Sequence, residues 1–231
     1  MLDFARFSHL TFDCYGTLVD WEAGILAALA PVLARHGLAV DEAEQLRLYA
    51  ELEARQEAGP YKRYREVLRG VVAGLGEALG FAPRADELDV LADSLADWPL
   101  FPDTLDALQR LHRRYRLAIL SNVDDDLFAG TAARLGVAFD EVVTAQQVGS
   151  YKPSLANFRC VLARLGVAPQ RVLHVAQSLY HDHAPARRLG LATAWVNRPS
   201  RRPGVGVALA AAAAPDLELP DLASLADAAG A

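Results

Sequence analysis

The stretch His-Leu-Thr-Phe-Asp-Cys-Tyr-Gly-Thr-Leu-Val-Asp-Trp, residues 9–21, decides the fold. Its first half is a short apolar run typical of a buried strand, and the run ends at Asp13. A turn around Gly16 follows directly. Open α/β sheets bind ligands at the carboxyl ends of their strands, so Asp13 is well placed to act as a nucleophile or to hold a metal. A carboxylate that only starts a turn is the alternative.

Beyond this stretch, short runs rich in β-branched residues alternate with helix-like segments. Further strands are predicted at Leu117–Ser121, Glu141–Thr144, Val172–Ala176 and Thr193–Val196, with an edge strand at Asp216–Leu219. The helix-like segments are Thr104–Arg114, Asp125–Leu135, Leu155–Leu165, His183–Leu189 and a last one near Leu222–Ala229. This alternation predicts an α/β fold with a Rossmann-like parallel sheet as its core.

The segment between the first and second strands contains no convincing strand. Four helices are predicted there, at Ile25–His36, Asp41–Glu57, Tyr61–Leu79 and Asp86–Asp97. We therefore expect an inserted helical cap domain at 18–101 and a core made of 1–17 and 102–231. The connections Leu18–Trp21 and Trp98–Pro102 would hinge the cap. A helical subdomain without a gating role is the alternative.

Composition narrows the classes of partner. The 231 residues are 52% hydrophobic and carry a net charge of −6 without a basic stripe, which argues against nucleic acid as a partner. Only Cys14 and Cys160 are present, which suits a reducing, cytoplasmic location. The N-terminus lacks the layout of a signal peptide. The weakly polar stretch Val205–Pro215 is too short to cross a membrane, and we interpret it as a loop or helix fragment.

Polar residues follow four of the predicted strands at their carboxyl ends. Asp13 and Thr17 follow the first strand, and Ser121 with Asn122 the second along the chain. The next two strands are followed by two further polar residues, Lys152 and Asp182. Because the carboxyl ends of parallel strands share one edge of the sheet, these side chains are expected to surround a single pocket for a small molecule.

These positions resemble the four motifs of the haloacid dehalogenase superfamily. Asp13 to Thr17 matches the first motif, Ser121 the second, Lys152 the third and Asp182 the fourth, and the resemblance covers essentially the whole chain. It implies a hydrolase with an aspartate nucleophile and a helical cap in the early insertion site.

Two departures indicate the branch within that superfamily. Its phosphatases carry a second Asp where this chain has Tyr15, and usually an acidic residue where it has Gln177. Mg²⁺ prefers anionic oxygen ligands, so we expect no metal and no cofactor. The motif Tyr-Gly-Thr after Asp13 resembles the L-2-haloacid dehalogenase branch. In that chemistry Asp13 would attack C2 of a 2-halo acid, and water would then hydrolyse the aspartyl ester.

Side-chain chemistry suggests a role for each remaining motif residue. Lys152 is a cation that keeps the nucleophile ionised and pairs with the substrate carboxylate. Ser121 holds that carboxylate, and Asn122 donates to a leaving halide. Thr17 fixes the rotamer of the nucleophile, and Asp182 orients the lysine or the hydrolytic water.

Three further residues, Tyr15, Ser178 and Arg47, are expected to touch the substrate. Dehalogenases use a cap arginine for the halide, and Arg47 lies in the matching helix, where the family resemblance places it only approximately. Three other arginines compete for this role, namely Arg55, Arg63 and Arg65. A tyrosine of the family is replaced by Phe158, and the asparagine of its fourth motif falls near Ser178.

Three alternatives stay open. The motifs also resemble an azetidine-2-carboxylate hydrolase, in which the Asp would displace a strained ring amine. A Mg²⁺-dependent phosphatase is the second, possible if Asp182 and main-chain oxygens suffice. A catalytically silent binding module is the third. Because relatives often dimerise, a homodimer is also possible.

Overall fold

The sheet has six parallel strands in the order β3-β2-β1-β4-β5-β6. These come from a computed structural model that describes residues 2–198 and 213–231. The strand bounds are β1 His9–Phe12, β2 Arg116–Ser121, β3 Glu141–Thr144, β4 Val172–Ala176, β5 Ala192–Val196 and β6 Leu217–Leu219. The predicted α/β fold with a parallel sheet is confirmed.

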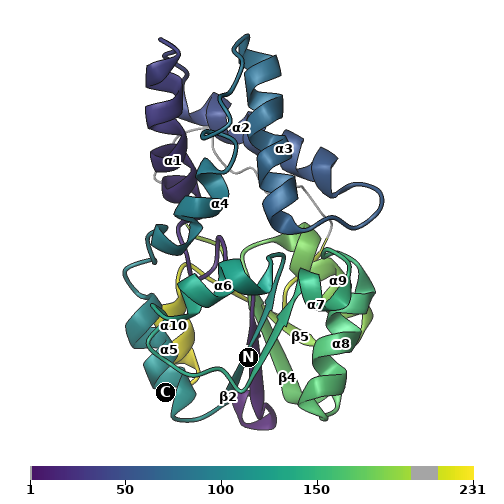
Figure 1. Cartoon of the computed structure of the whole chain (residues 1–231). Helices are drawn as coiled ribbons and strands as arrows, with labels where there is room; N and C mark the ends of the chain where they lie inside the picture. Colours follow the sequence, from purple (N-terminus) through teal and green to yellow (C-terminus); the bar gives the residue numbers. More distant parts are fainter. Residues whose placement is uncertain (1, 199–212) are drawn as a thin grey trace.

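Helices cover both faces of the sheet and its carboxyl edge (Figure 1). The helices between β1 and β2 are α1 Trp21–Arg35, α2 Glu42–Glu57, α3 Tyr64–Leu79, α4 Val90–Ser94 and α5 Thr104–His112. The later helices are α6 Asp125–Ala132, α7 Ala145–Val148, α8 Leu155–Leu165, α9 Ala184–Arg188 and α10 Leu222–Ala228. Short 3-10 turns flank them at Phe4–Arg6, Leu95–Asp97 and Pro169–Arg171, and a π-helical turn spans Leu179–His183.

Strand β2 shows how the sequence builds two cores. Leu117 and Ile119 belong to a large apolar cluster on one face of the sheet, while Ala118 and Leu120 belong to a second cluster on the other. Successive side chains of a strand point to opposite faces, so this apolar run buries both sides. Helix α8 covers the second face through Phe158.

Helices α1 to α4 form a separate layer beyond the carboxyl edge of the strands (Figure 1). Both connections to this layer run side by side: Val19 forms an antiparallel bridge with Leu100, and the Asp20 amide donates to the Pro99 carbonyl at 2.8 Å. Gly24 of α1 packs so closely on the hinge that a Cβ there would lie 2.2 Å from Trp98 Cγ. The domain bounds given above stay a prediction.

Differences from the predicted elements have local causes. Helix α1 begins at Trp21, four residues before the predicted start, because the Asp20 side chain accepts a hydrogen bond from the Ala23 amide and caps the helix. The predicted helix Asp86–Asp97 is reduced to α4 and a 3-10 turn. Helix α7, only four residues long, was not predicted. Most of the stretch Val205–Pro215 lies outside the described residues.

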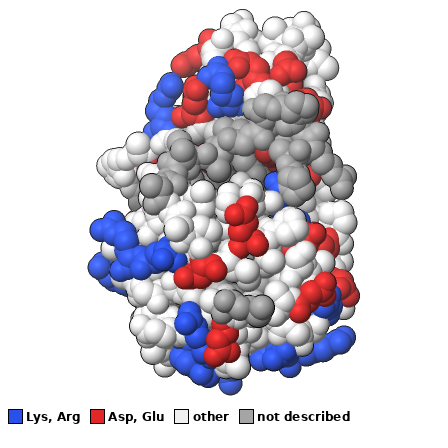
Figure 2. All heavy atoms as spheres, turned by 180° about the vertical axis from the view of Figure 1, so that it is seen from behind, with Lys and Arg blue, Asp and Glu red and all other residues white. Residues whose placement is uncertain are grey.

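Surface charge is mixed. On the face seen in Figure 2, Lys and Arg lie in several separate groups with Asp and Glu between them. Within the described parts of the chain, no helix is both long and apolar enough to cross a bilayer. The absence of nucleic acid and the possible homodimer stay predictions.

Candidate active site

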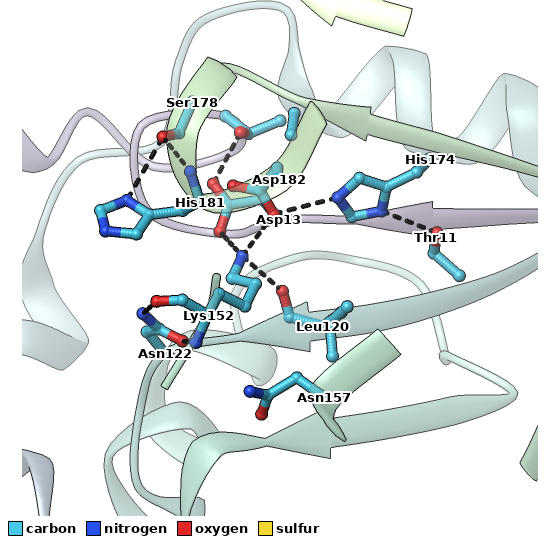
Figure 3. Close-up of polar contacts among 12 residues, drawn as sticks. Thr11, Asp13, Leu120, Asn122, Lys152, Asn157, His174, Ser178, His181 and Asp182 are labelled. Atoms are coloured by element: carbon cyan, nitrogen blue, oxygen red, sulfur yellow. Dashed lines mark hydrogen bonds and ion pairs between the residues drawn. The ribbon is translucent and has the colours of Figure 1, made fainter. Parts of the chain in front are cut away.

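A buried lysine links two carboxylates at the carboxyl ends of the strands (Figure 3). Lys152 Nζ donates to Asp13 Oδ1 at 2.8 Å and to Asp182 Oδ1 at 2.7 Å. Asp13 directly follows β1, and the other two residues follow β3 and β4 along the chain. The sequence therefore predicted correctly that these three residues meet at one edge of the sheet.

All three N–H donors of the Lys152 ammonium are engaged in hydrogen bonds. It has three N–H donors, and they go to the two carboxylates and to the Leu120 carbonyl oxygen at 2.9 Å. The expectation that Lys152 also pairs with the substrate carboxylate is therefore not met in this arrangement. Its charge serves to hold Asp13 and Asp182 in place.

Thr17 fixes the second oxygen of Asp13. Its hydroxyl donates to Asp13 Oδ2 at 2.8 Å and accepts from the backbone N–H of Gln177 at 3.0 Å. The turn between Asp13 and Thr17 requires Gly16, whose φ is 96°. Arg198 holds the same turn by donating to the Thr17 carbonyl at 2.9 Å. Arg198 follows β5 and was not predicted.

The two carboxylates titrate in opposite directions. Burial raises the pKa of Asp13, and the neighbouring Lys152 ammonium offsets this only in part. Burial also acts on Asp182, but Lys152 and His174 together hold the pKa of Asp182 well below its usual value. The surroundings of Asp182 therefore favour its charged form more strongly than those of Asp13 do.

A second layer behind Asp182 was missed by the sequence analysis. His174 Nε2 lies 3.0 Å from Asp182 Oδ1, and His174 Nδ1 lies 2.8 Å from Thr11 Oγ1. A carboxylate only accepts, so Nε2 carries a proton and donates it to Asp182, while Nδ1 forms a hydrogen bond with the Thr11 hydroxyl. Both residues alternate with apolar neighbours on β4 and β1, and this pattern alone gave no sign of a polar chain.

We expect His174→Leu to lower kcat by about 10- to 100-fold, because Asp182 loses a fixed donor and Lys152 loses its alignment. His174→Gln keeps a donor near Nε2 and should retain more activity than His174→Leu. Steady-state kinetics of both variants, with melting temperatures, provide the check. Equal losses in the two variants would show that packing, and not the donor, matters here.

A cavity of about 120 Å³ opens beside the cluster, far smaller than the ~300–1,000 Å³ of pockets for drug-sized ligands. Asp13, Tyr15 and Ser178 line it, as does Ser121, whose buried Oγ has no hydrogen-bond partner among the described residues. A buried, unpaired hydroxyl facing a cavity is poised to bind a ligand. The Tyr15 hydroxyl instead bonds Thr131 Oγ1 at 3.0 Å, so only the ring of Tyr15 faces the cavity.

Two predicted contacts lie differently from expectation. The Asn122 amide lines the cavity but already bridges the Lys152 backbone, accepting from its N–H at 2.7 Å and donating to its carbonyl at 3.2 Å. Asn122 thus positions Lys152.

The structure does not bring Arg47 to the site: its guanidinium is half-exposed and pairs with Glu44 and Glu51 on the outer face of α2. These carboxylates on the same helix hold it away from the cavity.

The donor set does not suit Mg²⁺. Residue 15 offers a phenol ring and residue 177 a neutral amide, while Asp13 and Asp182 each give one oxygen to Lys152. Among the residues at 2–198 and 213–231, no group of three or more His, Cys, Asp and Glu is arranged to hold a metal ion.

Fold and site together define a hydrolase built on a parallel α/β sheet. The model of the haloacid dehalogenase-like hydrolase family matches residues 7–190, and the chain belongs to that family. It is similar to (S)-2-haloacid dehalogenase 1 of Pseudomonas sp. (strain CBS-3), with 26% identity over 193 residues, 81% of this chain and 83% of the relative.

Other relatives span both branches of the family. A defluorinating L-2-haloacid dehalogenase of known structure superposes with a TM-score of 0.84 at 27% identity, covering 97% of this chain and 96% of that one. A phosphoserine phosphatase of Thermus thermophilus is 32% identical over 171 residues, 71% of this chain and 64% of the relative. Family membership alone therefore does not decide between carbon and phosphorus as the centre attacked.

Proposed function

We propose that the protein hydrolyses a small 2-substituted carboxylic acid, as 2-haloacid dehalogenases do, through an ester on Asp13. The observation that carries this proposal is the cluster in which Lys152 and Thr17 hold the two oxygens of Asp13 beside a small cavity. The relatives named as haloacid dehalogenases support the substrate class. We further propose a cytoplasmic location.

In the first step, a carboxylate oxygen of Asp13 forms a bond to C2, and the bond from C2 to the leaving group breaks. The leaving group departs with the electron pair, as halide does without a proton. Neither a general acid nor a metal is needed, which agrees with Tyr15 and Gln177 at their positions.

In the second step, water attacks the ester carbonyl carbon of Asp13. The oxygen held by Lys152 gains negative charge in this step, and the ammonium stabilises it. The bond between the Asp13 carbonyl carbon and the ester oxygen then breaks. That oxygen stays on C2, takes one proton of the water and leaves as the hydroxyl of the 2-hydroxy acid, and the other proton is released as the Asp13 carboxylate re-forms. Asp182 keeps Lys152 aligned throughout.

Isotope labelling tests the ester. In a single turnover in ¹⁸O water with excess enzyme, ¹⁸O should appear in Asp13 and not in the 2-hydroxy acid, because water attacks the protein carbonyl. Mass spectrometry of the peptide that contains Asp13 and of the product measures both. Label in the product alone would mean that water attacks the substrate carbon directly, and the ester would be ruled out.

A second candidate is ring opening of the azetidine-2-carboxylate type, in which Asp13 would displace a ring amine. Two further carboxylates in the cavity wall, Glu53 and Glu57, favour an amine-bearing substrate. Halide release from a 2-haloacid, compared with formation of an amine-bearing 2-hydroxy acid from the ring, separates the two candidates. Phosphate release sensitive to a chelator would instead favour a phosphatase.

A further inference from the structure

Helix α2 of the insertion presents two carboxyl groups to the cavity that contains Asp13. Glu53 and Glu57 are four residues apart and therefore lie on one face of the helix. Both line the same cavity as Asp13 and Lys152. The insertion thus adds acidic side chains to a site whose strand ends already hold two carboxylates.

Neither glutamate forms an ion pair with a basic side chain of the described residues, and the nearest cation acting on Glu57 is the Lys152 ammonium. Glu53 Oε1 accepts hydrogen bonds from the hydroxyls of Tyr49 at 2.9 Å and Tyr64 at 2.5 Å. Among the described residues, no Lys or Arg forms an ion pair with Glu53 or Glu57. On the outer face of the same helix, by contrast, Glu51 pairs with Arg47 at 2.5 Å. The inward Glu53 is therefore held by two hydroxyls, and neither inward carboxyl group forms an ion pair within the described residues.

Acidic side chains therefore outnumber basic ones in the wall of the cavity. Four carboxyl groups line it against one ammonium, that of Lys152, whose protons are all engaged. His181 also lines the cavity, but burial lowers the pKa of His181 to about 4, so its ring is neutral near pH 7. A 2-haloalkanoate has no group that binds to Glu53 and Glu57, whereas an ammonium group can pair with both carboxyl groups.

We propose that Glu53 and Glu57 form a subsite for the ammonium group of a small zwitterionic substrate, an amino or ring imino acid. This inference rests on the proposed attack by Asp13 and names the substrate class for it. The unpaired Ser121 hydroxyl at the strand ends takes the substrate carboxylate. The two ends of the zwitterion then bind to groups from different parts of the chain, the ammonium to the insertion and the carboxylate to the end of β2.

The pKa shifts of Glu53 and Glu57 agree with an ammonium subsite. Burial raises the pKa of both Glu53 and Glu57 above the ordinary value of 4.5, and for Glu57 the neighbouring Glu53 adds to the rise while Lys152 opposes it. An ammonium group within reach stabilises the ionised carboxylates and reverses that effect. In a ring imino acid the nitrogen already carries its proton, so Asp13 bonds to ring carbon while the C–N bond breaks and its electron pair stays on nitrogen.

Binding of two isosteric acids tests the subsite. Azetidine-2-carboxylate carries the ammonium, and cyclobutanecarboxylate replaces that group with carbon. Calorimetry on an Asp13→Asn background, which prevents turnover, should give a Kd at least about tenfold lower for the azetidine. Glu53→Gln and Glu57→Gln should each reduce this preference by about tenfold. Glu51→Gln, which removes an exposed charge from the same helix, should leave the preference unchanged.

Two results would overturn the subsite. One is cyclobutanecarboxylate binding as tightly as azetidine-2-carboxylate, and the other is a preference that survives in the double variant Glu53→Gln/Glu57→Gln. Circular dichroism and melting temperatures confirm that the variants are folded. Binding needs no turnover, so the subsite stands or falls independently of the ¹⁸O result for Asp13. An enzyme that labels Asp13 with 2-chloropropionate but shows no ammonium preference keeps the ester and loses the subsite.

Discussion

Asp13→Asn is expected to reduce turnover by about 10⁴-fold or more while the fold persists. The amide is a far weaker nucleophile than the carboxylate, and its nitrogen cannot accept from Lys152 or Thr17. Lys152 keeps Asp182 and the Leu120 carbonyl as partners, so the cluster retains its cation. Single-turnover assays and circular dichroism measure the two parts of this result.

A matched control for this variant is Asp106→Asn, which removes an exposed carboxylate from α5. Wild-type turnover is expected there. Retention of more than about a hundredth of the activity by Asp13→Asn would mean that another group attacks the substrate.

The pH dependence of the wild type gives a further check on its acid limb, the low-pH side of the profile. Because the pKa of Asp13 is raised, kcat/KM should fall as pH decreases, with a midpoint above 3.8.

Lys152→Met is expected to cost both stability and activity. The variant leaves two buried carboxylates without their cation, and breaking a buried pair costs about 3–5 kcal/mol of unfolding free energy. Loss of the ammonium that stabilises the negative charge on Asp13 Oδ1 during ester hydrolysis should lower kcat by about 10²- to 10³-fold. Urea denaturation and steady-state kinetics measure these effects.

The pH dependence of Lys152→Met has a definite sign. Without the ammonium, the pKa values of Asp13 and Asp182 both rise, so the acid limb of kcat/KM should move to higher pH. In the wild type, the lowered pKa of Asp182 contributes stability above 3.8, and this is lost as pH falls through the lowered value. Lys62→Met changes the only other lysine and should leave kinetics unaltered. An unmoved acid limb in Lys152→Met would contradict this account.

The sequence predicts the part of the site that lies at the ends of the strands. Strand runs such as Val172–Ala176 are short, apolar and bounded by breakers, and their carboxyl ends fix where Asp13, Lys152 and Asp182 meet. The parallel topology brings these ends together without any knowledge of side-chain rotamers.

The sequence could not predict which residues of the helical insertion face the cavity, because this depends on the directions of their side chains. A helical pattern does not show that Arg47 turns outward to Glu51 while Glu53 turns toward the cavity, because both positions are polar in a polar helix. His174 was missed because the strand pattern of β4 predicts only that the residue is buried, and it does not show which polar group its ring contacts. Local capping, as at Asp20, shifted the start of α1 by four residues.

The bridge between Val19 and Leu100 has a wider consequence. Because the chain leaves the sheet and returns to it at one point, we expect exchange of the intervening segment to leave the strand order unchanged. Glu53 and Glu57 belong to this segment, whereas Asp13, Lys152 and Asp182 do not. With the subsite proposed for Glu53 and Glu57, we expect a graft of α1–α4 from a relative to change which molecule is accepted while Asp13, Lys152 and Asp182 keep their places.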